Sequence, residues 1–403
     1  MVGGRVGVVG GSIAGCAAAL AATRIGADEV VVFERAAARL EERGVGLALH
    51  NDRYAELAAA GYLDASIPWI QLTRRPWVVR DDASRGGREI GVLQLPFRSY
   101  SWGSLWEELR HRVPERVDYR TGAQVARVSR ETGGAVVHLA DGTEERFDLV
   151  IGADGYRSVV RAAMHPGAVA EYGGFVVWRG TLPAERLPDP AEAFHEEDAA
   201  TVGFPGGHLL SYRIPGSGGG GTTVNWVFYA TPPDTVVSQF ADPQTVQPRL
   251  MSDELRRYHL RLVADHLPPF WQEVVRRTQP EDTFVQPMYD MVAPSYALGR
   301  LVLLGDAAAV GRPNTGSGAV KALQDAAALE RALRADDSWE SALETYGAER
   351  VAVGRATVEL GRRLGRAQVT HTPDWAAMDQ QALDHWWGEA SGAKGFGGYE
   401  MRR

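Results

Sequence analysis

The sequence predicts an α/β fold, in which a Rossmann-like parallel-sheet domain is interrupted by a mixed β-sheet domain and followed by C-terminal helices. Three short apolar runs, far apart in the chain, end at Gly10, Gly152 and Gly305. Continuous apolar runs are typical of buried parallel strands, which deliver tight turns to a ligand at their carboxyl ends. Between the second and third runs, residues 173–231 alternate between apolar and polar side chains. That pattern predicts an inserted antiparallel sheet with one polar or ligand-facing side.

The first apolar run opens a βαβ unit. Arg5–Val9 is predicted as a strand, Ile13–Thr23 as an Ala-rich helix, and Glu29–Phe33 as a second strand that ends at Glu34. The remaining elements follow from periodicity and turn residues. They are a helix over 102–112, short strands with turns over 118–149, a helix over 252–278, helices over 318–334 and 338–368, and a Gly-rich tail over 391–399 that we expect to be mobile.

These elements divide into three expected parts. The boundaries are residues 1–70, 97–172 and 286–335 for the parallel-sheet domain, 71–96 and 173–285 for the inserted sheet domain, and 336–403 for the C-terminal helices and tail. A chain of 403 residues exceeds one ordinary core, which fits more than one domain.

The turn after the first strand fits a dinucleotide. Gly10 permits a tight turn, and Gly15 lets the helix pack close to the strand. The helix N-terminus offers free N–H groups and a positive dipole end to a pyrophosphate. Glu34 stands where an acid can accept hydrogen bonds from ribose hydroxyls. Ser12 occupies the place of the fingerprint's second glycine, and its side chain adds a Cβ near the phosphates.

The third run leads into a second anion-binding pattern. Gly305–Asp306 ends the strand, and Asp306 suits a sugar hydroxyl. Pro313 and the Gly316–Gly318 stretch then lead into a helix, whose start again favours an anion or a dipole.

Composition narrows the function further. The net charge is −8 and no basic run is present, which argues against a nucleic-acid partner. Cys16 is the single cysteine, so we expect no disulfide framework and a cytoplasmic protein. No His/Cys/Asp cluster has ligand spacing, so we expect no metal. No window reaches the length of a membrane span, so we expect no membrane partner.

Three motifs in this order resemble those of the class A FAD-dependent aromatic hydroxylases, the p-hydroxybenzoate hydroxylase fold, over nearly the full chain. Gly10–Gly15 with Glu34 is similar to the family's ADP-binding turn. Asp154–Gly155, followed by Ser158 and Arg161, is similar to its second motif, which serves both FAD and the nicotinamide nucleotide.

Gly305–Asp306 with Pro313 and Gly316–Gly318 is similar to the third motif of the family, with Asp306 on the ribityl chain of the flavin. Arg43 and Gly44–Leu47 are similar to its loop beside the flavin. The resemblance therefore implies that FAD contacts Gly10, Ser12, Ile13, Ala14, Gly15, Glu34, Arg35, Arg43, Gly44, Gly46, Val125, Asp154, Gly155, Gly305, Asp306, Pro313, Gly316, Ser317 and Gly318.

Within this family, the chain is most similar to the 2,6-dihydroxypyridine 3-hydroxylase branch. The supporting residues are Trp178–Gly180, Asn225–Val227, Gln286–Asp290, Arg312–Pro313 and Lys321. Two positions depart from the pattern: Ala309 stands where the family often has histidine, and Asn314 where the branch tends to carry one. Because both lie near the expected flavin and substrate pocket, substrate identity does not transfer from the branch.

The resemblance implies a reaction as well as a fold. NADH or NADPH reduces the flavin, O2 gives a flavin C4a-hydroperoxide, and one oxygen atom passes to an electron-rich aromatic or hydroxylated heteroaromatic small molecule. The protein positions the cofactor, excludes water and tunes charge. The helix that begins near Gly316 places its positive dipole end at the flavin N1 edge. The family's frequent dimers make a homodimer the expected assembly.

A phenol or hydroxy-azaarene reacts better when it is deprotonated, so a base or a hydrogen-bond acceptor is wanted. The candidates are His50, His208, Tyr212, Tyr229 and Tyr289, each of which could instead be a structural or surface residue. The candidate substrate-pocket residues are Trp178, Asn225, Trp226 and Asn314, of which the aromatic ones could equally be core residues of the sheet.

Two alternatives remain at this point. An epoxidase or Baeyer–Villiger monooxygenase of natural-product biosynthesis would share these motifs. The second alternative is a flavoprotein that holds FAD for structure and does not oxygenate. It remains because Ala309 stands where the family often has histidine.

Overall fold

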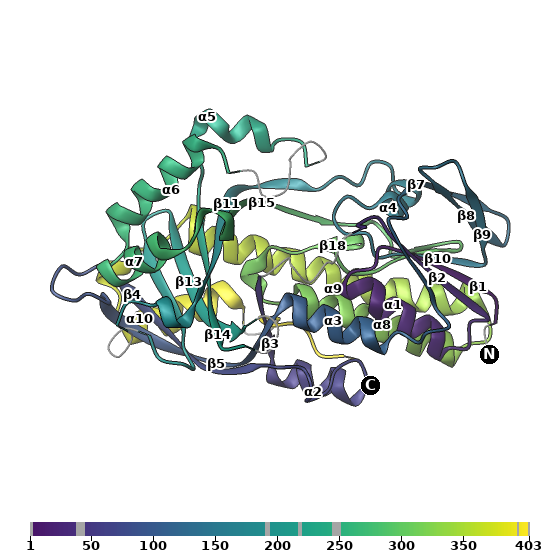
Figure 1. Cartoon of the computed structure of the whole chain (residues 1–403), viewed down its shortest axis with the longest axis horizontal. Helices are drawn as coiled ribbons and strands as arrows, with labels where there is room; N and C mark the ends of the chain where they lie inside the picture. Colours follow the sequence, from purple (N-terminus) through teal and green to yellow (C-terminus); the bar gives the residue numbers. More distant parts are fainter. Residues whose placement is uncertain are drawn as a thin grey trace.

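Two large sheets lie toward opposite ends of the molecule (Figure 1). The computed structural model describes residues 3–37, 45–189, 194–216, 220–243, 251–392 and 395–401. Within them, no helix is long and apolar enough to cross a membrane.

The six-stranded sheet is the predicted Rossmann-like sheet. Its order is β16-β17-β10-β1-β2-β6, and all strands run parallel except β16. The bounds are β1 (Arg5–Val9), β2 (Glu29–Glu34), β6 (Asp118–Thr121), β10 (Leu149–Gly152), β16 (Ala297–Leu298) and β17 (Leu301–Leu303). The three predicted glycine turns therefore follow three adjacent strands, β17, β10 and β1.

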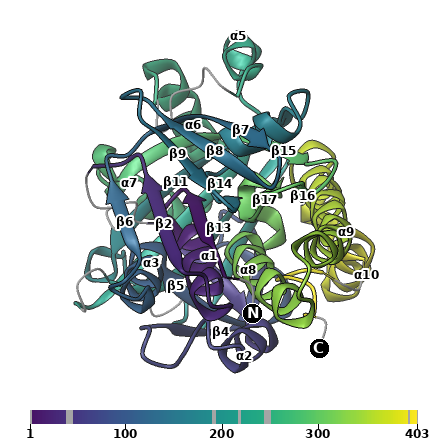
Figure 2. The same ribbon diagram turned by 90° about the vertical axis from the view of Figure 1, so that its right-hand side faces the viewer.

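Helices cover this sheet. Helix α1 (Ile13–Arg24) packs against α8 (Gly318–Ala335) and α3 (Trp102–Arg112), and Figure 2 shows α1 and α8 side by side. The residues of α1 are almost all small and buried, which lets α8 approach closely. Helix α9 (Trp339–Gly365) packs on α8 and continues into a short π-helical turn, Arg366–Thr370.

The second large sheet has nine strands in the order β18-β15-β11-β14-β13-β12-β4-β5-β3. The predicted antiparallel pairing holds for β11, β13 and β14, but β12 also pairs in parallel with β4, so the sheet is mixed. Its strands are β3 (Gly46–His50), β4 (Ile70–Val79), β5 (Arg88–Ser101), β11 (Glu171–Pro183), β12 (Ala199–Phe204), β13 (Gly207–Pro215), β14 (Thr222–Ala230), β15 (Thr283–Val292) and β18 (Ala309–Val310).

Two helices cover one face of this sheet. That face packs an apolar core against α6 (Asp253–His266) and α7 (Pro269–Arg277). These two helices replace the single helix expected over 252–278, because Pro268 and Pro269 interrupt it. The smaller elements are a three-stranded sheet of β7 (Val125–Glu131), β8 (Gly134–Leu139) and β9 (Glu144–Phe147), with helices α2 (Asn51–Ala59), α4 (Val159–Met164), α5 (Asp234–Val237) and α10 (Gln380–Ser391).

Candidate active site

The carboxyl edge of the parallel sheet brings the motifs together. The Gly10 amide donates to Phe33 O at 2.8 Å, and the Ala153 amide donates to Val9 O at 2.8 Å. The Leu304 amide donates to Gly152 O at 2.9 Å. The turns after β1, β2, β10 and β17 are therefore bonded side by side, as a cofactor held along its length would require.

The first turn needs its glycines. Gly10 has φ +99°, and a Cβ there would lie 2.4 Å from Ala153 O. A Cβ on Gly15 would lie 1.8 Å from Gly10 O. The Ser12 side chain makes no capping hydrogen bond to α1, and the first turn of α1 carries no acid. Helix α1 therefore directs uncapped N–H groups at this edge, which fits a pyrophosphate.

Gly11 is the anchor of this turn, a role that the sequence did not reveal. Gly11 O accepts from Trp106 Nε1 at 2.9 Å and from Tyr119 Oη at 2.6 Å. The Gly11 amide donates to Glu34 Oε2 at 2.8 Å, while Glu34 Oε1 accepts from Ala36 N. Glu34 thus holds the turn, and each carboxylate oxygen keeps a lone pair for a further donor. Trp106 and Tyr119 lie on α3 and β6, outside any motif.

The second motif is tied to the third. Asp154 Oδ2 accepts from Val159 N at 2.7 Å, and Ser158 Oγ accepts from Arg161 N at 2.9 Å, so both cap α4. The buried Arg161 donates to Ala307 O at 3.0 Å and to Tyr156 O. Burial raises the pKa of Asp154. These contacts fix the distance between the two motifs.

A buried ion cluster fixes the third motif. Gly305 has φ +56°, its amide donates to Asp325 Oδ2 at 2.9 Å, and its carbonyl accepts from Lys321 Nζ at 2.9 Å. Lys321 and Arg350 both donate to Asp325, each at 2.7 Å. The Asp306 side chain is exposed to the groove beside this cluster. Desolvation by the surrounding protein atoms raises the pKa of the Asp306 carboxyl, and the charge of Lys321 partly offsets this effect.

The loop before α8 forms the next part of the groove. Gly316 has φ +62°, and α8, like α1, begins with no side-chain cap and no acid in its first turn. Asn225 Oδ1 accepts from Gly46 N at 3.0 Å, so β14 holds the start of β3 against this loop. The expected flavin contacts Arg43 and Gly44 lie outside the described residues. Two uncapped helix starts and an exposed acid between them suit the phosphates and hydroxyls of FAD.

A cavity of about 60 Å³ lies between this loop and the uncovered face of the nine-stranded sheet. An apolar cavity that binds benzene is larger, at about 150 Å³. A ring therefore enters only when lining side chains move. The lining residues are Leu72, Arg75, Leu95, Phe97, Ala199, His208, Leu210, Tyr212, Tyr229, Pro313, Asn314, Gly316, Gln368 and Phe396.

The polar groups of the cavity are neutral hydrogen-bonding groups apart from Arg75. His208 Nδ1 lies 3.2 Å from Gln368 O, which can only accept, so Nδ1 carries the proton and Nε2 is an acceptor. Burial and the nearby Arg75 lower the pKa of His208 to about 3. Burial raises the pKa values of Tyr212 and Tyr229, which stay protonated.

The C-terminal segment closes this cavity on one side. Phe396 packs against Phe97 and Trp387, with ring centroids 5.4 and 4.9 Å apart. The Gly397 amide donates to Thr315 O at 2.8 Å. The segment runs on toward α2, where the C-terminus lies in Figure 1. Over the described residues 395–401, the expectation of a mobile tail is therefore wrong, because the segment packs on the third-motif loop.

Three of the five candidate catalytic side chains, those of His208, Tyr212 and Tyr229, line the cavity together with the candidate pocket residue Asn314. His50 and Tyr289 do not. His50 Nδ1 accepts from Asp52 N at 3.2 Å and so caps α2. Tyr289 donates to Phe240 O at 2.8 Å and stacks on Tyr156.

The aromatic pocket candidates occupy the wrong face of the sheet. Trp178 and Trp226 are fully buried in the core beneath α6 and α7. Trp178 stacks on His259 at 5.1 Å, and Trp226 donates to Thr278 Oγ1 at 2.9 Å. Neither side chain lines the cavity, and both occupy the core position that the sequence analysis left open. Asn225 lies between strand neighbours on the opposite face and contacts the Gly46 loop instead of the cavity lining.

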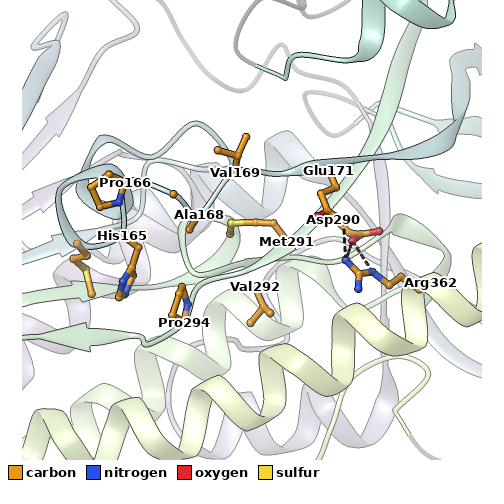
Figure 3. Close-up of a pocket in the computed structure, with 12 residues that line it drawn as sticks. His165, Pro166, Ala168, Val169, Glu171, Asp290, Met291, Val292, Pro294 and Arg362 are labelled. Carbon is orange, nitrogen blue, oxygen red and sulfur yellow. Dashed lines mark hydrogen bonds and ion pairs between the residues drawn. The ribbon is translucent and has the colours of Figure 1, made fainter.

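A larger hollow of about 500 Å³ lies elsewhere, beside Asp290 (Figure 3). It shares no lining residue with the cavity and includes none of the three motifs. Asp290 accepts from Arg362 at 2.8 Å and from Arg312 at 2.7 Å, as part of an ion cluster that holds Arg312 in front of Pro313. Size alone therefore does not identify the active site here.

Comparisons with known proteins agree with this geometry. Residues 109–360 match the family model described as "FAD binding domain". The chain is 31% identical over 373 residues to 2,6-dihydroxypyridine 3-monooxygenase of Paenarthrobacter nicotinovorans, covering 89% of this chain and 90% of the relative. It is 30% identical to 3-amino-4-hydroxybenzoate 2-monooxygenase of Streptomyces cremeus, covering 92% and 88%.

A solved structure shows the same fold. The structure of 2,6-dihydroxypyridine-3-hydroxylase from Arthrobacter nicotinovorans superposes with a TM-score of 0.80 at 23% identity, covering 94% of this chain and 96% of that chain.

Proposed function

The chain belongs to the class A FAD-dependent aromatic hydroxylases, and from this membership we propose which of its residues hold the cofactor and which receive the ring. The protein is an NAD(P)H-dependent monooxygenase that hydroxylates an aromatic small molecule. When bound, FAD supplies electron transfer from NAD(P)H and the activation of O2. The chain supplies binding, orientation and a dry cavity.

The cofactor is held along the carboxyl edge of the parallel sheet. The N-terminus of α1 at Ser12–Gly15 receives the pyrophosphate, and Glu34 receives the adenosine ribose. Asp306 accepts from a ribityl hydroxyl, and the N-terminus of α8 receives the ring edge. Gly10, Arg35, Gly46, Val125, Gly155 and Pro313 are proposed as further contacts, together with Arg43 and Gly44, which lie outside the described residues.

The ring binds in the cavity between Pro313 and the sheet. The single observation that carries this proposal is the convergence of His208, Tyr212, Tyr229 and Asn314 on one small cavity beside the third-motif loop. His208 Nε2 accepts a hydrogen bond from the ring hydroxyl and orients it, because its low pKa keeps the imidazole neutral. The related enzymes act, by name, on a dihydroxypyridine and an aminohydroxybenzoate, which are rings of this size and polarity.

The test is NADH and NADPH oxidation by the FAD-loaded protein, with O2 uptake and product mass, across hydroxypyridines and hydroxybenzoates. Stimulated oxidation with a product heavier by one oxygen atom is the expected result. Wild-type protein that fails to retain FAD, or that oxidises NAD(P)H without oxygenating any compound, would contradict the proposal. Asp306→Ala should weaken FAD retention, and Asp282→Ala, at an exposed 3-10 turn, is its control.

Two further expectations are proposals of the same kind. A homodimer is expected from the family's frequent dimers, and light scattering at assay concentration decides it. A cytoplasmic location is expected from the single, buried cysteine, and fractionation of the native host decides it.

A further inference from the structure

Arg75 is a buried cation in the wall of the cavity. It lies on β4, is 4% exposed, and is a lining residue. Its guanidinium stacks between two indole rings, 4.9 Å from the Trp77 centroid and 5.1 Å from that of Trp387. Nε donates to Thr201 Oγ1 at 3.0 Å. These contacts hold the planar group in one orientation.

In the described part of the chain, no anion balances this cation. Among the residues that the structure describes, no carboxylate forms an ion pair with the Arg75 guanidinium, and its only hydrogen bond is the one to Thr201. Burial accordingly lowers the pKa of Arg75 to about 10. An ion withdrawn from water without a partner is costly, so a cavity that keeps one is suited to a ligand that brings the counter-charge.

A second arginine near the cavity, Arg179, adds to this positive charge. The charged groups that shift the pKa values of His208, Tyr212 and Tyr229 are Arg75 and Arg179. Arg179 lies on the neighbouring β11, and its Nε is buried without a partner in the described part of the chain. Both arginines therefore favour a negative group in this space.

We propose that the substrate ring carries an anionic oxygen, and that Arg75 binds this oxygen and selects ionised rings over neutral ones. The inference rests on the proposed function and names the substrate class of the same site. Two sources of the charge are possible, a ring carboxylate or an ionised ring hydroxyl. In either case the planar guanidinium donates paired N–H groups to the oxygen while His208 Nε2 remains an acceptor for a neutral hydroxyl.

The test is ligand binding to the oxidised, FAD-loaded protein, measured through the flavin absorption spectrum without NAD(P)H. Matched pairs differ only in charge: a hydroxybenzoate against its hydroxybenzamide for each ring position. Wild-type protein should bind the hydroxybenzoate more tightly than the hydroxybenzamide. Arg75→Gln should raise the dissociation constant of the hydroxybenzoate roughly 30-fold and leave that of the hydroxybenzamide unchanged. Arg75→Lys should recover part of the preference, because the charge returns without the planar fork.

The second arm separates the two sources. Hydroxypyridines and phenols without a carboxylate are titrated at pH values on both sides of the compound's own pKa. If a ring hydroxylate is recognised, its dissociation constant falls as the compound ionises, and Arg75→Gln abolishes this dependence. If a carboxylate is recognised, only the hydroxybenzoates show the Arg75 effect.

Arg213→Gln is the matched control. Arg213 is likewise buried in the nine-stranded sheet and stacks on Phe194, but it does not line the cavity. A purely structural role for Arg75 would lower the urea midpoint of Arg75→Gln and leave the anion-to-amide ratio unchanged. That outcome overturns the inference when Arg75→Gln also leaves the pH dependence of hydroxypyridine and phenol binding unchanged. A wild-type protein that binds no anionic ring at millimolar concentration overturns it as well. Loss of FAD or of NAD(P)H-dependent oxygenation would instead refute the proposed function, because the binding assay requires neither NAD(P)H nor turnover.

Discussion

Acidification should destabilise the protein through two buried histidines. Burial lowers the pKa of His208, where Arg75 adds to the effect, and the pKa of His259, each to about 3. An exposed imidazole in the unfolded chain has a pKa of about 6.5. Below that pH each of these histidines is protonated in the unfolded chain but stays neutral in the folded chain. The free energy of unfolding therefore decreases as the pH falls.

The magnitude follows from the two pKa values. The contribution of each histidine to the free energy of unfolding is complete above about pH 6.5. Below that pH it decreases by about 1.36 kcal/mol for each pH unit, until the folded pKa near 3 is reached. At about pH 5 the loss is therefore about 2 kcal/mol for each histidine and about 4 kcal/mol for both. This is a large part of an ordinary folding stability.

The assay is urea unfolding of the protein in a fixed excess of FAD at about pH 7.5 and about pH 5, followed by tryptophan fluorescence. The comparison is with the double variant His208→Asn and His259→Phe. Asparagine keeps a donor toward Gln368 O, and phenylalanine keeps the ring that stacks on Trp178 at 5.1 Å. Carboxylates titrate equally in both proteins, so the difference isolates the histidines. The same pH dependence in wild type and double variant would refute this reasoning.

Three further outcomes are expected. Asp306→Ala should weaken FAD binding about 10-fold or more, because a charged hydrogen-bond acceptor is lost, and flavin titration of the apoprotein measures it. Gly10→Ala should abolish FAD binding, since its Cβ would lie 2.4 Å from Ala153 O, whereas Gly133→Ala has a similar positive φ but no neighbour within 4 Å and should retain FAD. Phe396→Ala should release more H2O2 per NAD(P)H oxidised, because water reaches the cavity; an unchanged ratio of H2O2 to product would show that the C-terminal segment does not seal it.

The cofactor side of the fold could be predicted because its signals are local. An apolar strand, a glycine and a helix start stand next to each other in the chain, so Gly10, Asp154 and Gly305 mark strand ends without any knowledge of distant contacts. The contacts that brace these turns could not be predicted. Trp106 and Tyr119 reach Gly11 from elements that carry no motif, and only their packing reveals them.

The residues of the substrate cavity were harder to predict from the sequence, for a different reason. Every residue of β14 from Val224 to Ala230 is buried, so apolar character does not separate its two faces. Asn225 and Trp226 are neighbours and must point to opposite sides, yet the sequence does not say which side meets the cofactor. Arg75 was missed because β4 reads as an ordinary strand, and its lack of a counter-ion is visible only in three dimensions.

The strand order of the parallel sheet has a consequence for how the protein is made. Val8 pairs with Ile151, and Ile151 pairs with Val302, so neighbouring strands come from widely separated parts of the chain. Contacts of such long range form slowly, because long loops must close before any pairing compensates the lost entropy. While the ribosome is still translating residues 173–285, strands β1, β2 and β10 are already made but lack their neighbour β17. Slow synthesis, low temperature and ample flavin should therefore raise the soluble yield. Each favours pairing of these unpaired strands within their own chain over aggregation with other chains.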